Sequence, residues 1–113
     1  MTITAFKDRL RNTSLSIDFQ ETMTLIENHY TFTPTTFSNG DVTNEAGSNS
    51  GSCKVFAFAK IQGLTKEETL ACFGQYYTDV LNTPDGDNHQ NIRNFMKTGF
   101  EGLIFKGAAL KEK

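Results

Sequence analysis

The chain has 113 residues, of which 37% are hydrophobic, 21% charged and 12% aromatic, and its formal net charge is −2. This length predicts one domain, and surface scaling predicts about 6,000 Å² of exposed area after folding against roughly 18,000 Å² before it. No apolar run approaches the roughly 18 residues of a membrane helix, and no secretory signal peptide is recognisable. The slight acidity argues against a nucleic-acid partner. We therefore expect one domain with neither a membrane nor a nucleic-acid partner.

Two cysteines, Cys53 and Cys72, form no C-x-x-C pair. Without a signal peptide, a reducing compartment and two free thiols are expected. This reasoning favours the cytoplasm.

The N-terminal part of the chain predicts two amphipathic helices. Apolar residues at helical spacing indicate the first over about Ile3–Arg11, with Thr2 as its cap and Asn12–Ser14 as its end. The second is expected over Asp18–His29, where the first residue and Glu21 have the spacing of a capping box.

The segment Tyr30–Ser52 is long, polar and rich in Gly, which is uncommon for a loop in a compact domain. Asn39 and Gly40 form a hairpin-turn signal between Thr35–Phe37 and Asp41–Thr43. Part of this segment is therefore predicted to be a short strand or hairpin.

The segment Cys53–Ile61 is apolar all round, so its periodicity suits either a buried strand or a buried helix. We favour a helix, because Ser50 or Ser52 can cap it and Gly63 can end it.

A helix is most clearly indicated over Lys66–Leu81, with Thr65 and Glu68 as its capping box. Its buried stripe is expected to contain Leu70, Phe73, Tyr77, Val80 and Leu81. The segment Thr83–Gly86 then has the pattern of a turn, with Pro at its second position and Gly at its fourth.

The last predicted helix covers about Asn88–Thr98. Asp87 and Gln90 have capping-box spacing before it, and Gly99 suits its end.

A short strand is expected at Leu103–Phe105, and Thr35–Phe37 is its available partner. The residues Lys111–Lys113 are expected to form a solvated tail. The sum is an α+β fold: one mostly helical domain with about five short helices and a small two-stranded β element.

The Gly- and Ser-rich turn Gly47–Lys54 is the first candidate site. Successive backbone N–H groups running into a helix N-terminus can hold an anion, and Lys54 adds positive charge. The turn is not a P-loop, because Cys53 stands where that motif needs Gly before its Lys. The structural alternative is a helix cap and a tight loop packed against the core.

Cys53 is the second candidate. At a helix N-terminus beside Lys54 its pKa would fall, and His89 could serve as its base. The structural alternative makes Cys53 and Cys72 small hydrophobic residues of the core.

The start of the last helix is the third candidate. It could hold a carboxylate or phosphate, with two residues of the preceding helix on the other side of the pocket. The residues concerned are Asp87, His89, Gln90 and Arg93, facing Gln75 and Tyr76. In the structural alternative, Asp87 and Gln90 cap the helix and Arg93 pairs with an acid.

Zinc would need four ligands, and the available set is Cys53, Cys72, His29 and His89. None lies at ligand spacing to another, so we expect no metal and no cofactor.

Four collinear blocks of sequence are similar to one family. They are F-T-P-T-x-F-x-N-G (Phe32–Gly40), N-E-A-G-x-N-x-G-S-C-K-V-F-A-F-A (Asn44–Ala59), C-F-G-Q-Y-Y-x-x-V-L (Cys72–Leu81) and H-Q-N-I-R-N-F-M (His89–Met96). Together they resemble the HopJ type III effector family of small bacterial proteins, and the resemblance implies a single HopJ-like domain over residues 1–113. It implies no reaction and no catalytic residues. It does imply passage through a type III secretion system into host cells.

The function expected from these observations is non-enzymatic binding of a host or bacterial protein, with the loop Phe32–Ser52 as the recognition surface and a monomer as the oligomeric state. One alternative is a thiol-dependent enzyme that uses Cys53 with His89. Another is a resident cytoplasmic protein that binds a small anionic ligand. The candidate ligand-binding residues are Asn44, Asn49, Ser50, Gly51, Ser52, Lys54, Gln75, Tyr76, His89 and Arg93. In a purely structural role, the side chains of Asn44, Asn49 and Gln75 would instead be buried and paired internally.

Overall fold

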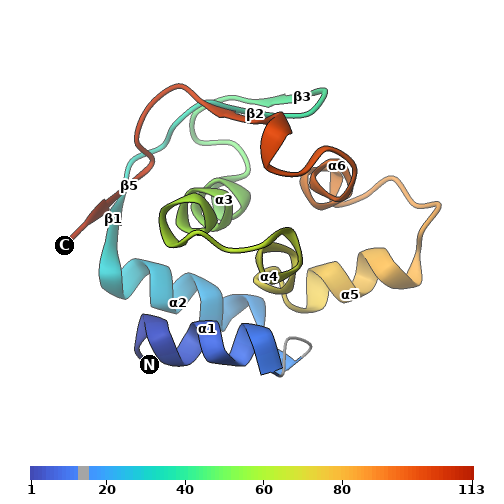
Figure 1. Cartoon of the computed structure of the whole chain (residues 1–113). Coiled ribbons are helices and arrows are strands. Elements are labelled where there is room, and N and C mark those ends of the chain that lie inside the picture. The colour runs from blue at the N-terminus through green and yellow to red at the C-terminus, as the bar shows by residue number, and fades with distance from the viewer. Residues whose placement is uncertain (13–15) are drawn as a thin grey trace.

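Helix α3 (Ser50–Gln62) lies at the centre of the molecule, and the other elements surround it (Figure 1). The structure is a computed structural model that describes residues 1–12 and 16–113. The middle of α3, residues 55–59, is buried on every side, which explains its all-round apolar sequence, and the predicted helix is confirmed. Gly63 ends it with a φ of 65°. The predicted Ser cap is wrong, because Asn49 occupies the N-cap position.

Helices α1 (Ile3–Asn12) and α2 (Phe19–His29) form a layer beneath α3 (Figure 1). Thr2 caps α1, since its Oγ1 accepts a hydrogen bond of 3.0 Å from the N–H of Ala5. The capping box of Asp18 and Glu21 is also confirmed at the start of α2. The predicted end of α1 is confirmed at Asn12, and its remaining residues, 13 and 14, lie outside the described residues.

The single helix predicted over 66–81 is wrong: the chain forms α4 (Lys66–Ala71) and α5 (Gln75–Asn82). The break is at Gly74, where φ is 57° and a Cβ atom would lie 2.5 Å from the backbone N of Phe19. The capping box at the start of α4 is confirmed. Leu81 is 47% exposed, so it does not belong to the buried stripe.

A three-stranded antiparallel sheet lies across the top of the molecule in Figure 1, in the order β3-β2-β4. The predicted hairpin is confirmed as β2 (Phe37–Asn39) and β3 (Val42–Asn44). The predicted strand β4 (Leu103–Phe105) is also confirmed. Its register pairs Phe37 with Phe105 and Asn39 with Leu103, so its partner is two residues further along than Thr35–Phe37.

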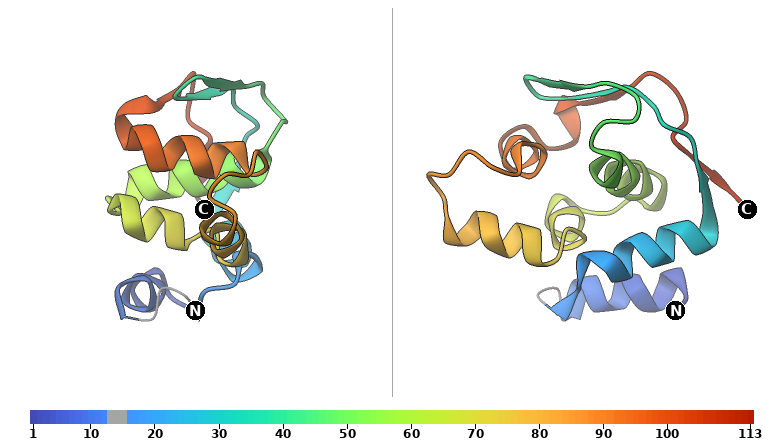
Figure 2. Two further views of the ribbon diagram at one scale, coloured as in Figure 1. Left: turned by 90° about the vertical axis from the view of Figure 1, so that its right-hand side faces the viewer. Right: turned by 180° about the vertical axis from the view of Figure 1, so that it is seen from behind.

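A second, two-stranded sheet joins β1 (Tyr30–Phe32) to β5 (Leu110–Glu112). The predicted tail Lys111–Lys113 is solvent-exposed, as expected, but Lys111 and Glu112 form part of β5. Leu110 is buried, and the N–H of Lys113 donates to the carbonyl of His29 at 3.2 Å. Figure 2 shows the C-terminal strand lying along the segment that follows α2.

Helix α6 (Gln90–Thr98) continues into the 3-10 helix η2 (Gly99–Gly102). Gly99 ends α6 as predicted, but the Asp87–Gln90 capping box is wrong because His89 is the N-cap, with a φ of 52°. In the left-hand view of Figure 2, α3 and α6 begin on the same side of the molecule.

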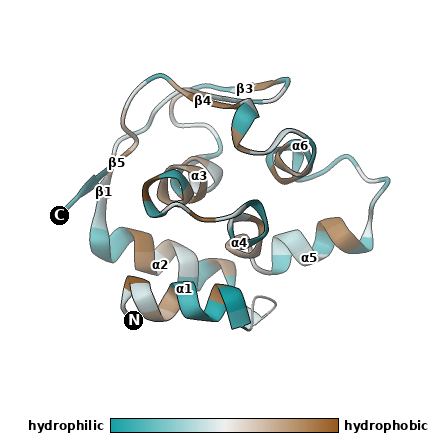
Figure 3. Cartoon of the chain, viewed as in Figure 1, coloured by the Kyte–Doolittle hydropathy of each residue, from teal (hydrophilic) through white to brown (hydrophobic). Residues whose placement is uncertain are grey.

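Aromatic side chains fill the core. The ring of Phe56 on α3 lies 6.0 Å from Phe37, 5.4 Å from Phe73 and 4.9 Å from Phe95, measured between centroids. Hydrophobic residues dominate α3, whereas β5 and the C-terminal end of α1 are hydrophilic (Figure 3). The described residues form six α-helices and two small antiparallel sheets, and they expose 6093 Å². The mostly helical α+β fold is confirmed, with one helix and one sheet more than predicted.

Candidate functional site

An open pocket of about 570 Å³ lies where four helices begin. The first turns of α3 and α6 contribute one wall, and Phe19 of α2 and Tyr76 of α5 contribute to the other. The sequence analysis placed the Gly- and Ser-rich turn and the start of the last helix in separate candidate sites. The structure brings both to this pocket.

Main-chain N–H groups form the donor wall. The first helical hydrogen bonds are those from Cys53 N to Asn49 O, at 3.0 Å, and from Arg93 N to His89 O, at 3.1 Å. The N–H groups that precede them have no partner in the described part of the chain, and five of the residues that carry them line the pocket: Gly51, Ser52, Gln90, Asn91 and Ile92. Neither helix has a side-chain cap, so these donors remain unpaired within the described residues at the edge of the pocket.

The residues before both helices hold an uncommon backbone conformation. Asn49 has φ 53° and His89 has φ 52°, and among the described residues they are the two non-glycine positions with positive φ. Both line the pocket. Such a conformation costs on the order of 1–3 kcal/mol, and it persists where the surrounding structure imposes it.

A network of asparagine amides supports the donor wall. Asn44 and Asn91 exchange two hydrogen bonds of 3.1 and 3.0 Å, and Asn49 donates to Asn44 Oδ1 at 2.7 Å. Asn39 donates to the side chain and the carbonyl of Asn91 at 3.0 and 2.8 Å, while its own Oδ1 is buried without a partner in the described residues. The network ties the hairpin to the start of α6.

The sequence analysis did not select Asn39 or Asn91. The Asn-Gly turn signal already accounts for Asn39 in the sequence, so nothing there indicated that its side chain also binds Asn91. Asn91 precedes the buried Phe95 by four residues, so a polar residue on the buried face of a helix was the available signal. Asn44 was selected as a ligand-binding residue, but it is buried and its hydrogen bonds are internal, as the structural alternative requires.

Aromatic rings form the opposite wall. Phe19 lies 5.0 Å from Tyr76 and 6.2 Å from Phe73, and Tyr76 lies 5.4 Å from the imidazole of His89. His89 Nε2 is 3.8 Å from Asp79 Oδ2 on α5. The rim of the pocket is therefore joined across α5 and α6.

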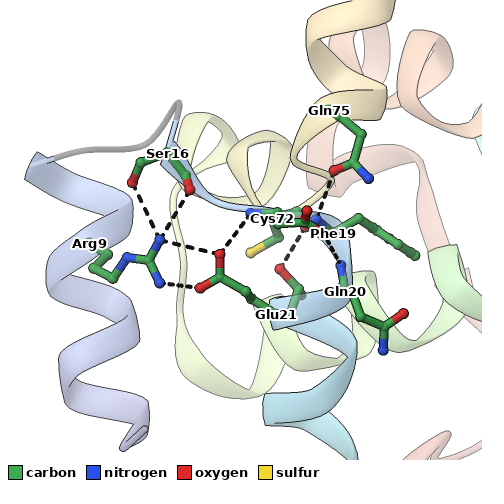
Figure 4. Close-up of polar contacts among 9 residues, drawn as sticks. Arg9, Ser16, Phe19, Gln20, Glu21, Cys72 and Gln75 are labelled. Atoms are coloured by element: carbon green, nitrogen blue, oxygen red, sulfur yellow. Dashed lines mark hydrogen bonds and ion pairs between the residues drawn. The ribbon is translucent and has the colours of Figure 1, made fainter.

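Gln75 does not line the pocket. Its Oε1 accepts a hydrogen bond of 2.9 Å from the N–H of Phe19, which joins the start of α5 to the start of α2 (Figure 4). Figure 4 also shows the ion pair between Glu21 and Arg9 on the other side of this junction. That pairing lowers the pKa of Glu21. Gln75 thus fixes the backbone of Phe19 from outside the pocket.

The two predicted cations face away from the pocket. Lys54 Nζ lies 3.4 Å from Glu27 Oε1 and 5.0 Å from the centroid of Phe32. The guanidinium of Arg93 is buried and donates to oxygen atoms of Thr83, Pro84 and Asn88. Neutral oxygen atoms therefore take the place of the acidic partner expected for Arg93. We also expected His89 and Arg93 to lie on one face of the helix, and this is wrong because His89 precedes the helix.

Cys53 lies outside the pocket lining and is 1% exposed. Burial raises the pKa of its thiol, although the contact with Thr35 O at 3.7 Å and the charge of Lys54 act in the opposite direction. Burial likewise raises the pKa of Cys72. The expected fall in the pKa of Cys53 is wrong, and the thiol-dependent mechanism loses its premise. Ser50 is also outside the lining, and its Oγ donates to Gly47 O at 3.5 Å.

In the described part of the chain, no three His, Cys, Asp or Glu side chains gather as a metal site would require. Within the same residues, no helix combines the length and apolarity needed to span a bilayer.

Fold and pocket define a small α+β domain in which two uncapped helix N-termini and an aromatic wall enclose an open cavity. The chain belongs to the HopJ type III effector protein family, whose model matches residues 3–110. It is similar to the crystal structure of "unknown function protein VPA0580", with 50% sequence identity and a TM-score of 0.97 over 100% of this chain and 95% of that one. Among curated proteins, none matches the sequence.

Proposed function

We propose that this protein is a non-enzymatic binding protein that holds a small oxygen-bearing anion in the pocket between α3 and α6. The observation that carries the proposal is the meeting of two uncapped helices at one cavity, where five residues with free main-chain N–H groups contribute to the lining. Helix N-termini attract negative charge because their unpaired donors and the helix dipole act together. The binding role is proposed for the bacterial cytoplasm.

The charges around the pocket favour a singly charged ligand. The lining contains Asp87 and neither Lys nor Arg. Each helix N-terminus stabilises an anion by about 0.3–1 kcal/mol when exposed and up to about 2 kcal/mol when partly buried. This supports one carboxylate better than a phosphate dianion, which Asp87 would repel.

The donor wall can be tested by removing a single N–H. Proline is tolerated in the first turn of a helix and carries no N–H, so Ser52→Pro removes a donor that faces the pocket. Ser52→Ala, which removes the same hydroxyl but keeps the N–H, is the matched control. Titration with acetate, followed by amide NMR, should shift the signals of residues 51–52 and 90–92.

The expected result is that Ser52→Pro weakens acetate binding several-fold, whereas Ser52→Ala leaves it nearly unchanged. Equal weakening by both variants, or amide signals that never move at high acetate concentration, would contradict the proposal.

Family membership supports a second role, passage through a type III secretion system and binding of a host protein. The surface offered to that protein is the hairpin side of the predicted loop, Phe32–Ser52. A fusion of the full chain to a reporter enzyme that is active only inside host cells tests this role. Reporter signal in infected cells, absent when the secretion apparatus is inactivated, is expected. Equal signals from both strains would contradict translocation.

A further inference from the structure

We infer that the ligand of this pocket is a planar aromatic carboxylate of one or two rings, an inference that rests on the proposed function. The geometry that points to it is the placement of an exposed aromatic surface directly beside the free N–H groups. The N–H donors alone would suit many anions, and the aromatic surface alone would suit many ring compounds. Because the two lie side by side, they favour a ligand that carries both a ring and a negative charge.

The aromatic wall is the exposed end of a continuous series of rings. It begins at the fully buried Phe56, passes through Phe73 at 5.4 Å and Phe19 at 6.2 Å, and reaches Tyr76 at a further 5.0 Å. Tyr76 is 38% exposed, and the partly exposed imidazole of His89 lies beyond it. The core fixes the inner rings, so the outer rings present a preformed surface against which a flat ring can stack.

The distance between the two walls at their junction is short. A Cβ atom added to Gly51 would lie 2.9 Å from Cζ of Phe19, so the first turn of α3 touches the edge of this ring. A ligand ring stacked in the pocket therefore lies close to the donors of Gly51 and Ser52. A carboxylate bonded directly to that ring, or one atom away, can reach these donors, whereas one on a long flexible chain would leave the aromatic surface uncovered.

Other ligand classes fit the pocket less well. Nucleotides and sugar phosphates carry several charges, and the lining offers no Lys or Arg to receive them. An amine would face the free N–H groups, which repel positive charge. A saturated acid of the same size satisfies the donors but makes no ring–ring contact.

The test compares benzoate with cyclohexanecarboxylate, which matches it in charge and ring size and lacks only aromaticity. Dissociation constants are measured from the amide shifts of residues 51–52 and 90–92, with acetate as the minimal carboxylate and benzamide as the uncharged ring. Benzoate is expected to bind roughly three- to tenfold tighter than cyclohexanecarboxylate, as the added contribution of ring pairing implies. Benzamide is expected to bind more weakly than benzoate.

Tyr76 provides the matched variants. Tyr76→Phe keeps the ring and should keep the preference for benzoate over cyclohexanecarboxylate, whereas Tyr76→Leu keeps an apolar side chain and should lose that preference. Thermal unfolding of both variants shows whether each remains folded.

The outcomes separate the two claims. Equal affinity for benzoate and cyclohexanecarboxylate in the unchanged protein, with acetate still bound, overturns the aromatic inference and leaves the proposed function standing. Absence of any shift with all three carboxylates overturns both.

Discussion

At the start of α6, His89 holds a left-handed conformation that glycine adopts without a steric penalty. Its imidazole contacts Tyr76 at the rim of the pocket, and it makes no side-chain cap to its own helix. We therefore interpret the strain at His89 as a cost retained for the geometry of the pocket rather than for the stability of α6.

Two substitutions at His89 test this interpretation. The variant His89→Gly should be more stable than His89→Ala by about 1 kcal/mol, because a Cβ atom in the left-handed region costs roughly 1–2 kcal/mol. Both should bind the pocket ligand equally weakly. Urea unfolding measures the difference in stability, and equal stability of the two variants would show that the strain has been misjudged.

The two cysteines behave as core residues, since burial raises the pKa of each thiol. Because the thiolate is the reactive form, neither should react measurably with a disulfide reagent in the folded protein at pH 7.5, and both should react in denaturant. Fast modification of one thiol under native conditions would restore the case for Cys53 as a nucleophile.

Glu68 links stability to pH. It accepts a hydrogen bond from the N–H of Thr65 at 2.8 Å and pairs with Arg11 at 3.0 Å, and these contacts hold the pKa of its carboxyl below the usual value. A carboxyl whose pKa is lower in the folded than in the unfolded protein stabilises the fold at pH values above the unfolded pKa of about 4.3. This stabilisation is lost as the pH falls through the folded-state pKa.

We therefore expect Glu68→Gln to reduce the loss of unfolding free energy on acidification below about pH 4.3. Glu67→Gln is the control, since Glu67 is exposed and makes no hydrogen bond or ion pair among the described residues. Urea unfolding at several pH values measures the effect. Identical pH profiles of the unfolding free energy for the two variants would show that Glu68 does not cause the acid-dependent loss of stability.

At the scale of elements, the junction between α4 and α5 depends on Gly74. A side chain there meets the backbone of Ile17, Asp18 and Phe19, which cannot move without disturbing the start of α2. Gly63 has φ 65° and ψ 37°, the left-handed conformation, and a Cβ atom added to it would meet no atom within 4 Å. Gly74 has ψ −128°, which lies outside the regions allowed to other residues, so backbone strain and steric exclusion act together there.

Gly63→Ala should destabilise the protein by about 1 kcal/mol, the cost of a left-handed Cβ. Gly74→Ala should cost clearly more, on the order of 3 kcal/mol, because its φ and ψ lie outside the regions allowed to L-residues and overpacking adds to that strain. Thermal or urea unfolding of both variants provides the comparison. Equal losses of stability would mean that the backbone around Phe19 moves aside at little energetic cost.

The elements also show where sequence reasoning succeeds. The capping boxes at Asp18 and Thr65 were predicted because each is complete within four residues. The starts of α3 and α6 were misassigned because left-handed residues held by distant contacts replace a local cap there. The break at Gly74 was missed for the same reason: its cause is the backbone of α2, far away in the sequence.

At the scale of the whole molecule, the pocket exists because four helix starts meet. Sequence spacing could identify the Gly- and Ser-rich turn and His89 separately, since each has a local signature. It could not orient Lys54 and Arg93, whose directions depend on Glu27 and on the oxygens of residues 83–88. Nor could it foresee the asparagine network, because its members become neighbours only in the folded chain.

The second sheet closes the molecule by joining β5 to β1. Deleting residues 110–113 removes the buried Leu110 and leaves Tyr30–Phe32 without its hydrogen-bonded neighbour. Burial of one Leu side chain contributes about 1.5–3 kcal/mol, so the truncated chain should unfold at a clearly lower temperature. Lys113→Ala is the control and should change the melting temperature little, whereas an unchanged melting temperature after truncation would show that β5 is dispensable.

That closing strand also sets the order in which the protein can be completed during synthesis. Every helix is translated before the segment that pairs with Tyr30–Phe32. The edge of β1 is therefore covered only after the last helix of the domain has been synthesised.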